Sequence, residues 1–383
     1  MLIQTDRLAE SRGHAASGQH REEHTYGIDL AGQRAQTPIV LTTLLALTEA
    51  LPTTPKRTVD SKLRNVWAGE NGTWVENIAV GSNGNLLVTL INLPEVWKVD
   101  PVLDTAELVY CFPDVNVTLG FAEVKHDVFA VNVGKFSVPG KGVPGSWSIW
   151  TLGCSTEHRR GHWGRASCER SVATKVAAVA PAKLLNGLTA LPTAPGNVLT
   201  ADSYMGRVFK IDTRTGTYCV AIDDPAMRPN ASSPIALGVN GIHVRNGELY
   251  FTNSLQSPLL AKVPTTADGS ASGPVQMTAE SPVYPLHLGI QADDLTIDAA
   301  GEFARIVTNP SGVVVKIELA LGHQTVVAGA ASDRTFAGAT SAAFGRSSID
   351  RSMLYVVTDG GAVDPSAAGI RGGTVIALDT AGL

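Results

Sequence analysis

Four polar side chains occupy matching places in a sequence pattern that recurs along the chain. Glu76, Asn186, Asn240 and Asp293 each open a short apolar run that has the length and composition of a β-strand. Carboxylate and amide oxygens are the ligands that hard cations such as Ca²⁺ and Mg²⁺ prefer. Carboxyl groups also transfer protons, and amides donate hydrogen bonds to a polarised oxygen. These residues can act together only if the fold brings them to one place.

The recurring pattern is an apolar strand, a turn, a second apolar strand that ends in Thr or Asn, and a third strand. Six copies occur, and their first strands begin, 44 to 66 residues apart, at Glu76, Gly120, Asn186, Asn240, Asp293 and Thr340. Units of this length with three or four short strands are typical of propeller blades. The predicted fold class is therefore all-β, a six-bladed β-propeller over residues 60–383.

The innermost strands of a propeller surround its axis, so the first residues of the six strands should form a ring. This ring would bring together two carboxylates and two amides, which could hold a divalent cation. The alternative is that they are polar residues solvated on a water-filled axis. His287 lies shortly before Asp293 and is a further candidate hydrogen-bond donor, with a purely structural histidine as the alternative.

The composition excludes several classes of protein. The 383 residues carry 30 Lys and Arg against 35 Asp and Glu, a formal net charge of −5, so there is no basic footprint for nucleic acid. No apolar stretch reaches the roughly 20 residues that a membrane-spanning helix needs. The expected partner is a hydrophobic small molecule, with no nucleic acid and no membrane span. The expected oligomeric state is a monomer or a weak dimer.

The N-terminal part differs from the rest of the chain. Residues 1–37 mix charged residues and His without apolar periodicity, which predicts a disordered or weakly ordered extension. Residues 38–59 contain an apolar segment of signal-peptide composition and a linker, with a short packed helix as the alternative. This segment favours the secretory pathway or secretion, as do three glycosylation sequons at Asn71, Asn116 and Asn230.

The four cysteines fall into two groups. Cys154 and Cys168 bracket a polar loop, and a disulfide between them would suit an oxidising compartment. Together with His158 and His162, the same cysteines could instead bind zinc. Cys111 and Cys219 lie in apolar runs and are expected to be buried thiols.

The six copies and the four polar residues resemble the SMP-30/gluconolactonase/luciferin-regenerating family of six-bladed propellers. The resemblance implies a divalent metal on the axis, held by Glu76, by Asn240 in Val-Asn-Gly-Ile and by Asp293, with Asn186 in Leu-Asn-Gly-Leu close by. It also implies that Asp293 would serve as the general base of a hydrolase.

The chain departs from the sugar-lactone hydrolases of that family at three positions. Leu184 stands where they have Arg, Gly187 where they have Asp, and Asp294 where they have Gly. The site would then lack the Arg that grips a polyhydroxylated acid, and would suit a hydrophobic ligand better. The phrases at 340–346 (Thr-Ser-Ala-Ala-Phe-Gly-Arg) and 238–242 (Gly-Val-Asn-Gly-Ile) resemble a fungal branch that includes hetero-Diels–Alderases of tropolone–sesquiterpenoid biosynthesis, of the xenovulene and eupenifeldin type.

Three functions remain open from this resemblance. The first is a hetero-Diels–Alder cycloaddition of secondary metabolism, joining a tropolone quinone methide to a humulene-type sesquiterpene alkene. It needs no cofactor, and Asn186, Asn240 or His287 would donate hydrogen bonds to the heterodiene oxygen. The second is a lactonase that depends on Ca²⁺ or another divalent cation, in which Asp293 or Glu76 moves the proton. The third is a non-catalytic ligand-binding propeller.

Overall fold

Residues 62–383 are described by the computed structural model, except for 139–140, 155–170, 234–235, 256–258, 281–291, 331–332 and 368. They fall within one compact unit, Thr58–Leu383, whose described part consists of β-strands with two short 3₁₀ turns. The predicted all-β fold class is therefore confirmed. The predictions for residues 1–37 and 38–59 concern residues outside the described part of the chain.

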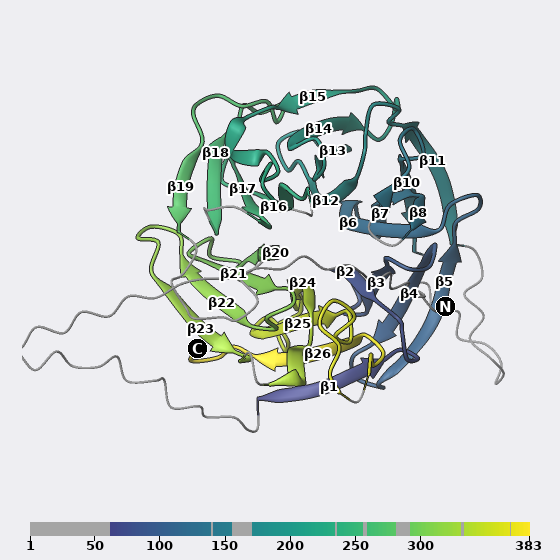
Figure 1. Cartoon of the computed structure of the whole chain (residues 1–383), viewed down its shortest axis with the longest axis vertical. Coiled ribbons are helices and arrows are strands. Elements are labelled where there is room, and N and C mark those ends of the chain that lie inside the picture. Colours follow the sequence, from purple (N-terminus) through teal and green to yellow (C-terminus); the bar gives the residue numbers. More distant parts are fainter. Residues whose placement is uncertain are drawn as a thin grey trace, which may run out of the picture. The chain divides into compact units, whose positions relative to one another are not determined.

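Six four-stranded antiparallel sheets, the blades, stand around a central axis (Figure 1). From the inside outwards, blade one contains β2 (Val75–Val80), β3 (Leu86–Leu90), β4 (Glu95–Asp100) and β5 (Thr105–Cys111). Blade two contains β6 (Val117–Lys125), β7 (Val128–Gly134), β10 (Ser148–Gly153) and β11 (Val172–Ala178). Blade three contains β12 (Leu185–Ala190), β13 (Asn197–Asp202), β14 (Arg207–Asp212) and β15 (Tyr218–Ile222).

The second half of the propeller repeats this arrangement. Blade four contains β16 (Val239–Arg245), β17 (Glu248–Asn253), β18 (Leu260–Pro264) and β19 (Gln276–Ala279). Blade five contains β20 (Ala292–Ile297), β21 (Phe303–Thr308), β22 (Val314–Glu318) and β23 (Gln324–Ala328). Blade six contains β24 (Ala339–Phe344), β25 (Met353–Thr358), β26 (Thr374–Asp379) and β1 (Leu63–Ala68). The remaining elements are the hairpin of β8 (Phe136–Val138) and β9 (Lys141–Gly142), and the 3₁₀ turns η1 (Pro225–Met227) and η2 (Arg334–Phe336).

The circle is closed in two ways. The innermost strands contact one another in the cyclic order β2, β6, β12, β16, β20, β24 and back to β2. In addition, β1 from the start of the propeller pairs with β26 from its end, and so supplies the outermost strand of blade six. The predicted number of blades is therefore confirmed. Three C-terminal strands form most of blade six, and β1 adds its fourth strand.

The apolar core lies between the blades. Among the described residues it forms six hydrophobic clusters, one for each pair of neighbouring blades. Each cluster is anchored by large side chains that are almost wholly buried, such as Trp147 between blades two and three and Phe336 between blades five and six. Because every blade is covered on both faces, inner strands such as β3 are buried along their whole length.

The outermost strands leave part of their side chains in solvent. Cys111 on β5 and Cys219 on β15 are both exposed, so the expectation that they are buried thiols is wrong. The physical reason is that an outermost strand has a neighbour on only one side, and an apolar run in the sequence does not reveal whether its strand lies inside or outside.

Candidate functional site at the propeller axis

Each innermost strand carries an irregularity near its start. The strand register shifts between Val75 and Asn77 in β2, and equivalent shifts occur in the five other innermost strands, at 118/121, 185/188, 239/242, 292/295 and 339/341. A β-bulge of this kind leaves residues unpaired and turns their side chains out of the regular pleat. The six bulges thus define one ring of positions at the axis.

The structure places Glu76, Asn186, Asn240 and Asp293 in four of these bulges. Thr340 occupies the bulge of blade six. In blade two the equivalent residue is Leu119, which is 1% exposed, and Gly120 follows it. The sequence-based assignment of Gly120 to this ring is therefore wrong by one residue, since the length of a bulge cannot be read from an apolar pattern.

Glu76 is buried and held by a tryptophan. The indole Nε1 of Trp74 donates a hydrogen bond of 2.7 Å to Oε2 of Glu76. Burial raises the pKa of Glu76 to about 8, and the negative charges of Asp294 and Asp359 act in the same direction, whereas the bond from Trp74 opposes them. The Glu76 carboxyl group therefore carries a proton over most of the neutral pH range.

Asp293 belongs to the same electrostatic group. Its Oδ1 accepts a hydrogen bond of 2.7 Å from Nδ2 of Asn240, and the same amide nitrogen also donates to Oγ of Ser254 at 2.9 Å. Removal from water raises the pKa of Asp293 well above its ordinary value, and the nearby carboxylates of Glu76 and Asp294 raise it further. The residue as a whole is half-buried.

Basic groups do not neutralise these acids. None of the ion pairs among the described residues includes Glu76, Asp293, Asp294 or Asp359. Four neighbouring carboxyl groups cannot all ionise in such a place, because each additional charge is repelled by the others and poorly hydrated. At neutral pH the Glu76 carboxyl group is therefore largely protonated and can donate a hydrogen bond.

A second polar layer lies directly beside the first. Oδ2 of Asp294 accepts hydrogen bonds from Nδ2 of Asn77 at 3.0 Å and from Oγ of Ser341 at 2.6 Å, which links blades five, one and six. On the opposite side, a Cβ placed on Gly241 would lie 2.3 Å from Oδ1 of Asp294. The glycine of blade four thus makes room for this aspartate, which holds four blades in register at the axis.

Asn186 is a ring residue whose side-chain amide has no hydrogen-bond partner among the described residues. Its backbone oxygen accepts a hydrogen bond of 2.6 Å from Nδ2 of Asn132, which fixes its bulge against blade two. Its side-chain amide makes no hydrogen bond to any residue in the described part of the chain, although Asn186 is 7% exposed. The amide is therefore available to a ligand on the axis.

The expected divalent-cation site stays a prediction, and the side chains of Glu76, Asn240 and Asp293 already bond to their neighbours. Asn240 turns an amide nitrogen towards Asp293, and one oxygen each of Glu76 and Asp293 already accepts a hydrogen bond. Among the described residues, no group of three or more His, Cys, Asp or Glu side chains forms a metal site, but the expected site, with two acids and two amides, is of a different kind. We therefore derive no chemical step through a cation.

Several predicted residues fall outside the site or outside the described chain. His287 lies in 281–291, and Cys168, His158 and His162 lie in 155–170, so neither the histidine donor nor the disulfide or zinc alternatives can be placed. No disulfide occurs among the described residues. Of the three sequons, Asn71 is exposed, whereas both ends of the Asn116 amide are already hydrogen-bonded to the backbone of Phe136.

The sequence reasoning missed Trp74, Asn77, Asp294, Ser341 and Asp359 as parts of the site. Asn77, Asp294 and Ser341 share one position, directly after the ring residue, where three other blades have glycine. Comparing the copies at this second position would have identified them. Asp359 follows the second strand of blade six and accepts backbone hydrogen bonds from Gly361 and Ala362.

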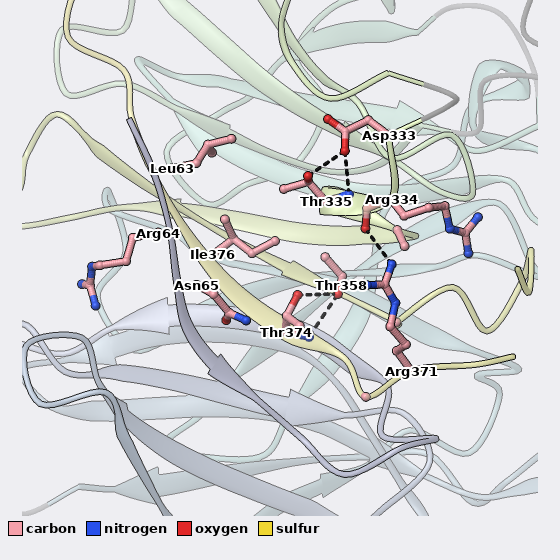
Figure 2. A pocket seen from close by; sticks show the side chains of 13 residues that line it. Leu63, Arg64, Asn65, Asp333, Arg334, Thr335, Thr358, Arg371, Thr374 and Ile376 are labelled. Atoms are coloured by element: carbon pink, nitrogen blue, oxygen red, sulfur yellow. Dashed lines mark hydrogen bonds between the residues drawn. The ribbon is translucent and has the colours of Figure 1, made fainter. Parts of the chain in front are cut away.

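A cavity among the described residues lies away from the axis. It has a volume of about 580 Å³ and is lined by β1, β26 and the turn η2 (Figure 2). Arg371 and Thr335 lie at its wall, but none of the ring residues does. We place the candidate chemistry at the axis, because reactive groups converge there, whereas in this groove Arg334 is bound to Asp364 and the Thr358 and Thr374 hydroxyls to each other.

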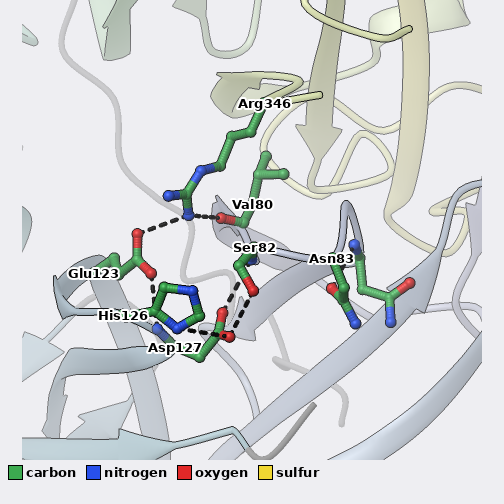
Figure 3. Close-up of polar contacts among 8 residues, drawn as sticks. Val80, Ser82, Asn83, Glu123, His126, Asp127 and Arg346 are labelled. Carbon is green, nitrogen blue, oxygen red and sulfur yellow. Dashed lines mark hydrogen bonds and ion pairs between the residues drawn. The ribbon is translucent and has the colours of Figure 1, made fainter. Parts of the chain in front are cut away.

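A serine, an aspartate and a histidine also meet at the opposite end of the innermost strands (Figure 3). Oγ of Ser82 bonds to Oδ2 of Asp127 at 2.6 Å, and Nδ1 of His126 lies 3.2 Å from the same oxygen. The hydroxyl therefore faces the carboxylate and not an imidazole, which is not the arrangement of an activated nucleophile. Arg346 completes this cluster by bonding to Val80 and Glu123, so that it ties blades six, one and two.

Fold and site together define a six-bladed β-propeller with an axial ring of carboxyl and amide groups. Solved structures that share this fold include the following two. One is a luciferin-regenerating enzyme, with a TM-score of 0.56 and 14% identity over 81% of this chain and 92% of that one. The other is the calcium-binding protein regucalcin from Agrobacterium tumefaciens, with a TM-score of 0.55 and 14% identity over 83% and 93%. At such identity the likeness shows the fold alone.

Sequence comparison adds two relatives, while no known family profile matches the chain. A Phoma sp. protein is 27% identical over 354 residues, which cover 83% of this chain and 92% of the relative. A Sarocladium schorii protein is 28% identical over 349 residues, which cover 82% of each. The names of both propose a hetero-Diels–Alderase activity for them. This chain is thus similar over most of its length to proteins named for that reaction.

Proposed function

We propose that this protein is an enzyme that catalyses a hetero-Diels–Alder cycloaddition without a cofactor. The observation that carries the proposal is the buried carboxyl group of Glu76, which forms no ion pair within the described residues and whose raised pKa of about 8 makes it a neutral donor at neutral pH. The two relatives named for this reaction support the same assignment.

The proposed reaction balances without any added group. The heterodiene contributes a C=O and a C=C bond, and the alkene contributes one C=C bond. One C–O and one C–C bond form between the partners, the remaining double bond shifts to the middle of the former heterodiene, and no atom leaves. Such a reaction needs two partners held in one orientation and an electron-poor heterodiene.

The axial groups supply both requirements in this proposal. A protonated carboxyl group of Glu76 or Asp293 donates a hydrogen bond to the heterodiene oxygen and draws electron density from the diene. The amide of Asn186 supplies a second donor from across the ring. Low hydration at the axis strengthens these bonds and limits the addition of water to a reactive quinone methide.

The proposed substrates are a tropolone-derived quinone methide and a humulene-type alkene. Two positions at which sugar-lactone hydrolases carry charged residues support an apolar ligand. Leu184 is 3% exposed and packs in the core between blades two and three, and a Cβ on Gly187 would lie 2.2 Å from the backbone oxygen of Asn240. Neither position offers a charge to a polyhydroxylated acid.

The proposal is tested by mixing the purified protein with a quinone-methide precursor and humulene. We expect accelerated, stereoselective adduct formation that a chelator does not change. Glu76→Leu should lose at least about tenfold in rate, because one donor to the oxygen is gone. Glu95→Leu is the matched control, since Glu95 accepts an equivalent tryptophan bond on an outer strand.

The same preparation is analysed for bound metal and for turnover of a panel of lactones with and without chelator. One equivalent of a divalent metal together with chelator-sensitive lactone hydrolysis would refute the cycloaddition as the main activity and support the lactonase alternative. Absence of both activities in a folded, ligand-binding protein would support the non-catalytic alternative.

We also propose that the protein is secreted and glycosylated. Asn71 is the sequon best placed for a glycan, because it is exposed and its side chain makes no hydrogen bond within the described residues. Treatment of the natively expressed protein with an endoglycosidase would show whether a glycan is present.

A further inference from the structure

Trp74 is fixed at both its backbone and its ring. Its backbone N–H donates to Oδ1 of Asn92 at 3.1 Å, and its carbonyl accepts from the N–H of Ile91 at 3.2 Å. Its indole nitrogen donates to Glu76, in the ring of bulges, at 2.7 Å. A rigid aromatic side chain thus lies two positions before Glu76, whose carboxyl group we place on the heterodiene oxygen.

The rings of the other described tryptophans pack against side chains of the protein. Trp67 and Trp97 stack on each other with ring centroids 6.0 Å apart, Trp147 is fully buried, and Trp150 packs on the core between blades one and two. Trp74 belongs to none of the six hydrophobic clusters and to none of the aromatic pairs found in the described chain, and it is only half-buried.

A half-exposed aromatic ring that is fixed by hydrogen bonds and lies outside the hydrophobic clusters can offer a flat surface to a ligand. We propose that the ring of Trp74 is the surface on which the flat, conjugated partner of the cycloaddition stacks. The inference rests on the proposed function. It adds the chemical class of the substrate that the site binds, which is a planar conjugated ring with an oxygen at its edge. Stacking would place that oxygen next to Glu76, because the indole edge already contacts this carboxyl group.

The chain offers a closely matched control for this residue. Trp97 donates from Nε1 to Oε2 of Glu95 at 2.8 Å, which repeats the Trp–Glu hydrogen bond with the same spacing of two residues. That pair lies on β4, one strand from the outside of blade one. A substitution at Trp97 therefore removes the same kind of interaction away from the axis.

The test measures binding of tropolone, a stable planar probe, by calorimetry to the full-length protein. We expect Trp74→Leu to weaken binding about tenfold, the effect of losing one good aromatic contact, while Trp74→Phe stays within about threefold of the wild type. Trp97→Leu should bind as the wild type does. Cycloheptanone, which has a similar ring without planar conjugation, should bind weakly to every variant.

A second measurement does not depend on whether Trp74→Leu folds. In wild-type protein labelled with 5-fluorotryptophan, tropolone should shift the ¹⁹F signal that Trp74→Phe removes, and leave the Trp97 signal in place. Equal tropolone binding by a folded Trp74→Leu, no binding by the wild type, or an unmoved Trp74 signal would each overturn the inference. Tropolone binding on Trp74 without adduct formation would instead refute the proposed function and leave the stacking surface standing.

Discussion

Glu76 is the ring residue with the most measurable chemistry. Its pKa of about 8 arises because burial and neighbouring carboxylates oppose ionisation more strongly than the bond from Trp74 favours it. The proton that results is the group which, in the proposed mechanism, polarises the heterodiene. The pKa of Glu76 should therefore determine how the rate of cycloaddition depends on pH.

The rate of adduct formation should fall as the pH rises through about 8, by up to tenfold per pH unit, because Glu76 then loses the proton that it donates. In Glu76→Gln the side chain stays neutral and the fall near pH 8 should disappear. The measurement is a pH–rate profile of both proteins, corrected for the uncatalysed reaction. Identical profiles would assign the donor role to another group.

Protein stability should also depend on this proton. The pKa of Glu76 is about 8 in the folded protein, against 4.5 for an ordinary glutamate, so the folded state holds a proton that the unfolded chain has released. The stabilisation is complete below about pH 4.5 and is lost as the pH rises through 8.

Urea unfolding of the wild type and Glu76→Gln at pH 5, 7 and 9 tests this. The free energy of unfolding of the wild type should decline relative to the variant by the order of a few kcal/mol across this range. A constant difference would show that Glu76 ionises alike in both states.

At this scale the sequence revealed the residue types of the ring but not their partners. Glu76, Asn186, Asn240 and Asp293 could be aligned because each starts an apolar strand. The bond from Trp74 to Glu76, and that from Ser341 to Asp294, depend on side-chain direction and on which blades adjoin, which strand periodicity does not encode.

The element that organises the site is the bulged start of the innermost strand. In three consecutive blades a glycine follows the ring residue, and each glycine faces the backbone of the next blade. A Cβ on Gly120 would lie 2.1 Å from the carbonyl oxygen of Asn186, and one on Gly187 would lie 2.2 Å from that of Asn240. The absence of a side chain is what lets these strands approach one another.

Gly120→Ala should therefore destabilise the protein by about 1–3 kcal/mol, since the neighbouring backbone cannot move aside cheaply. Gly153→Ala, also in a strand of blade two, is the control, because its Cβ would meet nothing closer than 3.8 Å. Thermal unfolding followed by circular dichroism compares the two. Equal unfolding midpoints would mean that the blades can separate at the axis without cost.

Strand positions were readable from the sequence, whereas bulges were not. The apolar runs located the innermost strands, but the ring position of blade two was misplaced from Leu119 to Gly120. A bulge adds residues to a strand without changing its apolar composition, so register near the axis had to come from the structure.

The described part of the chain is a ring of blades, and the sixth blade takes strands from both ends of the propeller. The pairing of β1 with β26 completes blade six and covers part of its core, including Ile376 and Leu378. The six copies in the sequence predicted the ring. They did not predict that β1, which precedes the first copy, pairs with β26 of the last one.

A chain that starts at Gly69 should lose much of its cooperativity and stability, because blade six then lacks its outermost strand. A chain that starts at Thr58, the first residue of the compact unit, should unfold as the full chain does. Thermal and urea unfolding of the two chains provide the comparison. Equal cooperativity of both would show that β1 is dispensable for closing the ring.

The pairing of β1 with β26 also affects the order in which the chain can fold during translation. Ala68 pairs with Thr374, and roughly 300 residues separate them, so at about 5–20 residues per second the ribosome needs approximately 15–60 s to deliver the partner of β1. During that time β1 is a strand without its neighbour, while blades one to five can form. For approximately 15–60 s the growing chain therefore carries one strand edge that can pair with another chain, so faster translation should shorten its exposure to aggregation.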